Sequence, residues 1–217
     1  MKMDKTLIFG FPVFTTKISK SLYERKKIIS TIEQNFKINN QRNKWDKQSV
    51  MHHSYNDWSN PTYKKVNFST LLPVYKKVIQ EIVDQMSFNK PIEYTFQIVN
   101  YTCLDSSNYM ASHDHPGCDF SAVHYLQFDK VNHSPTLFEN SSPHVNYMLT
   151  LRPDLLATLA PNHNVNSWAY RDWKLDSDED DFCLVPGVMR HCIESQQSKK
   201  KNRITVVINV DIKKQDA

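Results

Sequence analysis

Glycine is the residue that this chain most conspicuously lacks, with three among 217 residues. Phosphate-binding loops of the P-loop and Rossmann types need several glycines close together, because their backbone must approach the phosphate closely. No such loop can be assembled from three scattered glycines. Nucleotide-binding folds of these two types are therefore excluded.

Long hydrophobic runs and paired cysteines are also missing. No stretch approaches the roughly 20 apolar residues of a membrane-spanning helix, and the apolar run in MKMDKTLIFGFPVF is too short for a secretory signal. The four cysteines form no CxxC motif. We therefore expect reduced, mostly buried cysteines in a cytoplasmic protein that does not enter a membrane.

The chain has no strong excess of charge of either sign. The formal net charge is +4, and the densest basic run, at 199–201, lies in a short polar stretch. Without a basic stripe we do not expect nucleic-acid binding. Hydrophobic residues at 40% and charged residues at 23% are typical of a globular protein. We expect a single domain over residues 1–217.

Two amphipathic helices are predicted in the first 90 residues. Apolar residues recur at helical spacing over 21–36 and, more strongly, over 69–86. Ser21 and Glu24 have the spacing of a capping box at the start of the first helix. The polar segment 41–63 between them is expected to be irregular. We interpret residues 1–90 as a helical support for the rest of the chain.

The hydrophobic period changes to two from residue 91 onward. The segments IEYTFQIVNY, FSAVHYLQF, DFCLVPG and NRITVVINVDI alternate between apolar and polar residues. Short alternating strands after two helices predict a mainly β protein of the α+β class, an antiparallel sandwich or barrel buttressed by the helices. The long polar stretch 140–181, which contains Trp168, Tyr170 and Trp173, is expected to be a lid-like insertion.

Three histidines are candidates for a metal site. His113 and His115 point to one face of an extended segment, whereas Asp114 points to the other. Two imidazoles in this arrangement can reach one metal ion, and imidazole suits iron, zinc, copper and nickel. The alternative is that both are solvent-exposed loop residues. A further histidine, His191, lies between two strand-like segments.

The last predicted strand directs a charge toward the interior. Arg203, Thr205 and Val207 share one face of it, and the opposite face is apolar. A buried guanidinium needs a partner, because an unpaired buried charge is very costly. A dicarboxylate ligand would supply that partner through bidentate pairing. The alternative is an arginine at the mouth of the strand, in water or paired with a local acid.

The blocks HDHP, SAVHYL, CLVPGVMRH and RIT occur in this order between residues 100 and 210. In order and spacing they resemble the 2-oxoglutarate- and Fe(II)-dependent oxygenases. The resemblance is closest to a branch of uncharacterised members with an H-x-H-P motif, found in marine bacteria and phages. It implies a double-stranded β-helix, which is a cupin-like jelly roll, with iron at its open end.

The resemblance also implies roles for individual residues. His113 and His191 would be metal ligands, and Arg203 would bind the far carboxylate of 2-oxoglutarate with help from Thr205. Tyr125 matches a tyrosine that donates to the same carboxylate in prolyl-hydroxylase-like members. Most of the superfamily has a carboxylate two residues after the first histidine, where this chain has His115. A regular strand makes His115 the third ligand, whereas a twist before Pro116 would bring in Asp114.

The function implied is a dioxygenase that uses Fe(II), 2-oxoglutarate and dioxygen to hydroxylate a small molecule or a protein side chain. One alternative is a three-histidine cupin-type dioxygenase that does not use 2-oxoglutarate. Another is a non-catalytic jelly-roll interaction protein. The remaining histidines are expected to lie outside the site. His124 should pack on the outer face of its strand, and the others should lie on the surface: His52, His53, His133, His144 and His163.

Overall fold

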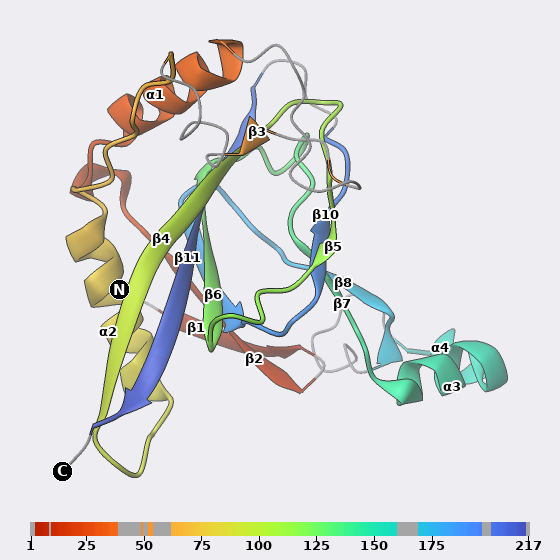
Figure 1. Ribbon diagram of the computed structural model, residues 1–217. Coiled ribbons are helices and arrows are strands. Elements are labelled where there is room, and N and C mark those ends of the chain that lie inside the picture. The colour runs from red at the N-terminus through yellow and green to blue at the C-terminus, as the bar shows by residue number, and fades with distance from the viewer. Residues whose placement is uncertain are drawn as a thin grey trace.

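The computed structural model describes residues 3–8, 10–38, 49, 52–53, 62–159, 169–196 and 201–215 (Figure 1). Two antiparallel sheets form its centre. The larger has the strand order β1-β2-β9-β6-β11-β4-β3 and the smaller the order β5-β10-β7-β8. The strands are β1 (Met3–Ile8), β2 (Phe11–Lys17), β3 (His52–His53), β4 (Ile92–Leu104), β5 (Met110–His113), β6 (Phe120–Gln127), β7 (Leu137–Glu139), β8 (Asp172–Lys174), β9 (Asp181–Pro186), β10 (His191–Ile193) and β11 (Arg203–Lys214). The expected mainly β fold with supporting helices is confirmed.

Helices α1 (Arg25–Ile38) and α2 (Leu72–Gln85) cover the outer face of the larger sheet (Figure 1). Their apolar stripes enter the main core, to which Ile32 and Ile79 each contribute a side chain with no exposed area. Both predicted helices are confirmed. The predicted capping box is wrong, because Ser21 lies in the short 3₁₀ helix η1 (Lys20–Leu22) and α1 begins only after Glu24. The Glu24 N–H donates instead to Thr70 Oγ1, at 3.2 Å.

The long strand β11 separates two environments. Ile204, Val206 and Ile208 pack into the core beneath the helices. Arg203, Thr205 and Val207 line a cavity between the two sheets. The predicted alternation of this strand is thus confirmed. The face of β11 that carries Arg203 and Thr205 points into the interior of the β-helix.

The N-terminal hairpin of β1 and β2 was not predicted. Its turn contains Gly10, whose φ of +82° lies in the region that favours glycine. Strand β2 then pairs with β9 and so extends the larger sheet. The segment expected to be a purely helical support therefore also supplies sheet strands.

The expected lid-like insertion contains α3 (Pro143–Leu151), α4 (Pro153–Leu156) and strand β8. The two helices project from one side of the molecule (Figure 1). Trp173 in β8 packs with Phe138 and Leu175 in a small core cluster. Trp168 lies outside the described residues, and so does the segment 54–60. Within the described ranges, no helix is long and apolar enough to cross a membrane.

Candidate metal centre

His113, His115 and His191 come together at one end of the smaller sheet. His113 ends β5 and His191 begins β10, and the two residues are direct partners in the antiparallel pairing. The potential ligand nitrogens of the three histidines all lie within 4.8 Å of one another. The ring centroids of His113 and His191 are 4.3 Å apart, and that of His115 is 5.3 Å from each. Three imidazoles at these separations can share one metal ion.

Hydrogen bonds orient two of the rings. His113 Nδ1 lies 2.9 Å from the carbonyl oxygen of Ala111, and His191 Nδ1 lies 2.8 Å from that of Met189. A carbonyl oxygen can only accept, so Nδ1 carries the proton in each case and Nε2 is the basic nitrogen. Metal-bound histidines typically donate their other ring N–H to such a partner. The two rings therefore have the tautomer that a metal ligand requires.

The environment also favours uncharged imidazoles. Burial, followed by the neighbouring His113, lowers the pKa of His191 to about 3. Burial, followed by His113, lowers the pKa of His115 to about 4. Neutral imidazole is the form that binds metals. At neutral pH these two ligand candidates are ready to bind without losing a proton.

Asp114 does not belong to the convergent group in the described part of the chain. The backbone of His115 is fixed by a hydrogen bond from its N–H to the carbonyl oxygen of Gly187, at 2.7 Å. A Cβ on Gly187 would lie 2.6 Å from the His115 carbonyl oxygen and would also meet the carbonyl oxygen of Cys118. The geometry thus places His115, rather than Asp114, beside His113 and His191. Its role as a metal ligand remains a prediction.

Arg203 is fully buried on the inner face of β11. Its Nε donates to the carbonyl oxygen of Ser134 at 3.1 Å, and both terminal nitrogens lack a hydrogen-bond partner among the described residues. The rings of Tyr125 and Phe128 lie 5.1 and 6.0 Å from its Cζ. Burial lowers the pKa of this guanidinium. The alternative of a solvated arginine at the strand mouth is therefore wrong.

Threonine hydroxyl groups line the same cavity as the guanidinium. Thr205 Oγ1 lies 2.7 Å from Thr102 Oγ1, and the Tyr125 hydroxyl lies 2.7 Å from Thr136 Oγ1. One cavity is lined by the three histidines together with Arg203 and the three threonines. Thr102 and Thr136 were not predicted as residues of the site. The alternation along β4 could have indicated Thr102. Thr136 lies in a loop, where the sequence has no hydrophobic period from which its position could be predicted.

Two further histidines are buried outside the convergent group. His124 is buried on the outer face of β6, as predicted, with Nδ1 2.9 Å from the Tyr75 hydroxyl. The surface prediction for His133 is wrong, because the side chain is only 4% exposed. Its Nδ1 accepts from the Asp129 N–H and its Nε2 lies 2.8 Å from the Lys201 carbonyl oxygen. The side chains of His52, His53 and His144, and all of His163, lie outside the described residues.

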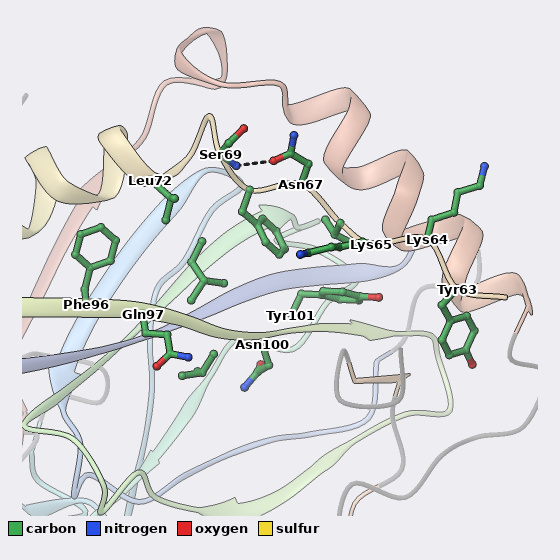
Figure 2. Close-up of a pocket in the computed structure, with 14 residues that line it drawn as sticks. Tyr63, Lys64, Lys65, Asn67, Ser69, Leu72, Phe96, Gln97, Asn100 and Tyr101 are labelled. Atoms are coloured by element: carbon green, nitrogen blue, oxygen red, sulfur yellow. Dashed lines mark hydrogen bonds between the residues drawn. The ribbon is translucent and has the colours of Figure 1, made fainter. Parts of the chain in front are cut away.

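A larger hollow lies over the edge of β4, against the segment 63–69 (Figure 2). Its lining includes Lys64, Lys65 and the aromatic residues Phe68 and Phe96. It contains none of the three clustered histidines and no carboxylate. The smaller cavity between the sheets is therefore the better candidate for chemistry.

No family model matches the chain, and no curated protein resembles it in sequence. Solved structures do resemble it in fold. The alpha ketoglutarate dependent carbocyclase SnoK from nogalamycin biosynthesis has a TM-score of 0.54 at 12% identity, with 92% of this chain and 79% of that one covered. A Pseudomonas putida prolyl-4-hydroxylase has a TM-score of 0.52 at 8% identity, covering 92% and 91%. A prolyl hydroxylase from Trichoplax adhaerens has a TM-score of 0.51 at 10% identity, covering 93% and 83%. The chain therefore has the double-stranded β-helix fold of these 2-oxoglutarate-dependent oxygenases.

Proposed function

We propose that the protein is an Fe(II)- and 2-oxoglutarate-dependent dioxygenase that oxidises a small molecule or a protein side chain. One observation carries this proposal: three convergent histidines line the same cavity as a buried guanidinium whose two terminal nitrogens have no hydrogen-bond partner among the described residues. One of the similar structures, SnoK, depends on the same co-substrate, which supports the proposal. Membership of the H-x-H-P branch, with its phage members, and a cytoplasmic location remain predictions.

Fe(II) would be held by His113, His115 and His191. The donor set fits, because neutral imidazoles suit iron and the two oriented rings present Nε2. Bound Fe(II) would supply the reaction with dioxygen, while the protein supplies binding, orientation and exclusion of water. A site with three neutral ligands leaves both charges of the ion uncompensated. The carboxylate of 2-oxoglutarate that is not held by Arg203 would offset one of them.

2-Oxoglutarate would be anchored at its far carboxylate by Arg203. A charged pair in a buried site gains most when each partner also makes further hydrogen bonds. Thr205 can donate one of them, and Tyr125 acts through its bond to Thr136, which faces the cavity. The rings of Tyr125 and Phe128 exclude water from the guanidinium. This arrangement fixes the co-substrate at one end and leaves its other end toward the histidines.

The three-histidine set favours a second candidate, a cupin-type dioxygenase that does not use 2-oxoglutarate. In that case Arg203 would bind an acidic group of the substrate itself. A non-catalytic jelly roll is the remaining alternative, and an unpaired buried guanidinium in the cavity argues against it.

Anaerobic titration of the protein with Fe(II) and then 2-oxoglutarate separates these candidates. We expect a metal-to-ligand charge-transfer band that saturates with one 2-oxoglutarate per chain, and slow succinate release when oxygen is admitted. Succinate as a control should give no band. Iron binding without a 2-oxoglutarate band would favour the cupin-type reading, and absence of iron binding would favour the non-catalytic one.

A further inference from the structure

A row of neutral polar side chains crosses the inner face of the larger sheet. Asn209 in β11 is paired with Ser121 in β6 and with Gln97 in β4. We call Ser121, Asn209 and Gln97 the polar row. Because side chains alternate along a strand, the row faces the same way as Val207, Thr205 and Arg203, which line the cavity. The polar row is thus the next layer outward from the cavity, on the side away from Arg203.

An irregularity in β4 completes this face. Val207 is paired with Asn100, whereas the next residue, Ile208, is paired with Ile98, so β4 holds one extra residue there. Such a bulge re-aims the side chains on either side of it. Gln97 and Asn100 both point away from the side that Phe96 and Tyr101 occupy (Figure 2). Asn100 consequently lines the cavity together with the histidines.

Three polar atoms of this face make no hydrogen bond with the described residues. They are Ser121 Oγ, Asn209 Oδ1 and Asn100 Oδ1, each without accessible area. Ser121 is 2% exposed and Asn100 is 8% exposed. A buried polar atom without a partner destabilises a fold by about 1–3 kcal/mol. Three such atoms on one wall would each lower the stability of the ligand-free fold, and a ligand with matching polar groups would satisfy them.

The chemistry of the wall limits that ligand. Between Arg203 and Asp211 this face of β11 carries only Thr205, Val207 and Asn209, and none of these is charged. Asparagine amides and a serine hydroxyl both donate and accept hydrogen bonds. They complement hydroxyl and carboxamide groups, which also do both. Beyond Arg203 this face of β11 offers no cation for a second anion, and Asp211 in the next position would repel one.

We propose that the polar row and Asn100 form the substrate-recognition wall, which takes a neutral substrate through a hydroxyl or carboxamide group beside the carbon that is oxidised. The inference rests on the proposed function, since it assigns Arg203 to the co-substrate. Beyond the proposed function, the inference names the residues that would bind the substrate. It also names the chemical group of the substrate that these residues would recognise.

The first test uses stability and needs no substrate. Ser121→Ala and Asn209→Leu replace unpartnered polar groups by apolar ones of similar size, so we expect the melting temperature of each variant to stay equal or rise. Affinities for metal and 2-oxoglutarate should also be unchanged. Lys213→Ala, at the exposed end of the same strand, is the matched control. A fall in melting temperature in both variants would show that these side chains are structural and would overturn the proposal.

The second test uses acetamide, ethylene glycol and acetate as probes on the Co(II)-loaded protein with 2-oxoglutarate bound. We expect the paramagnetic ion to enhance proton relaxation of acetamide and ethylene glycol, with loss of the enhancement in Asn209→Leu, and no effect on acetate. Equal enhancement of acetate, or full enhancement of acetamide in the variant, would overturn the proposal. Failure of the wild type to bind 2-oxoglutarate would instead count against the proposed function, and calorimetry detects it separately.

Discussion

At the scale of single residues, His115 and Asp114 are the two candidates for the third metal ligand. Alternation along an extended strand places His113 and His115 on one face, and the structure brings these two rings to His191. Both the ring orientation and the uncharged state follow from local contacts: carbonyl oxygens fix His113 and His191, and burial lowers the pKa of His115 and His191.

His115→Ala should lower the affinity for Fe(II) or Co(II) by at least about tenfold, because one of three ligand bonds is lost. Asp114→Ala should retain wild-type affinity, since its carboxylate lies outside the convergent group. Anaerobic calorimetry on both variants provides the measurement. The reverse ranking would mean that the backbone twists before Pro116 and that the site has a carboxylate ligand.

Arg203→Met should weaken 2-oxoglutarate binding by at least about tenfold, which corresponds to 1.4 kcal/mol, since a charge-assisted pair is lost. Metal affinity should hardly change, because the guanidinium contacts the co-substrate and not the ion. The melting temperature of the ligand-free variant should not fall, because two nitrogens of the buried guanidinium have no hydrogen-bond partner in the described part of the chain. Unchanged 2-oxoglutarate affinity would refute the assignment of Arg203.

At the scale of elements, the loops between strands position the site. The loop after β5 carries His115, and the turn after β9 carries Gly187, whose carbonyl oxygen accepts the His115 N–H. An ion cluster fixes α1 to the turn before β9. Arg25 in α1 pairs with Glu179 at 2.6 Å and with Asp180 at 3.2 Å, and Lys201 pairs with Glu179 at 2.6 Å.

Gly187→Ala should lower metal affinity by about tenfold or more, in the range found when groups that position a ligand are changed. Its added Cβ would meet the carbonyl oxygens of His115 and Cys118, which are backbone atoms that can yield only by moving the loop. Gly117→Ala is the matched control, because a Cβ there meets nothing within 4 Å. Calorimetric titration with Co(II) compares the two variants, and equal affinities would contradict the positioning role.

The ion cluster predicts a specific dependence of stability on pH. Burial raises the pKa of Glu179, but hydrogen bonds from Lys201 and the Phe128 N–H, together with the charge of Arg25, outweigh it and leave the pKa below its usual value. A carboxylate with a lowered folded-state pKa stabilises the fold above its ordinary pKa and loses that contribution as the pH falls through the folded-state pKa.

Glu179→Gln should therefore lower the free energy of unfolding at pH 7 by about 1 kcal/mol, in keeping with a partly exposed ion network. The difference from wild type should shrink as the pH falls below about 4, the usual range of a glutamate carboxyl. Urea unfolding at a series of pH values measures it. A difference that stays constant down to the lowest pH would show that packing, rather than charge, explains the effect.

At the scale of the whole molecule, the elements that could be predicted are those whose apolar residues recur at a regular spacing in the sequence. Burial of one face produces the alternation along β4 and β11 and the apolar stripes of α1 and α2. These patterns can be recognised in the sequence without knowing which element packs against them. The β1–β2 hairpin, the surroundings of Arg203 and the burial of His133 were not predicted. The last two depend on contacts between segments that are far apart in the chain: Ser134 reaches Arg203, and Lys201 reaches His133.

Metal binding should stabilise the whole fold, because the candidate ligands connect β5, the loop after it and β10. An ion that binds only the folded state adds about 2.7 kcal/mol to the free energy of unfolding at a concentration one hundred times its Kd. Thermal melts with and without Co(II) should show this increase in the wild type. His191→Ala should lose the metal-dependent increase, because it removes the ligand that links β10 to the other two. Arg203→Met is the control and should keep it. An equal rise in all three proteins would mean that the ion binds elsewhere.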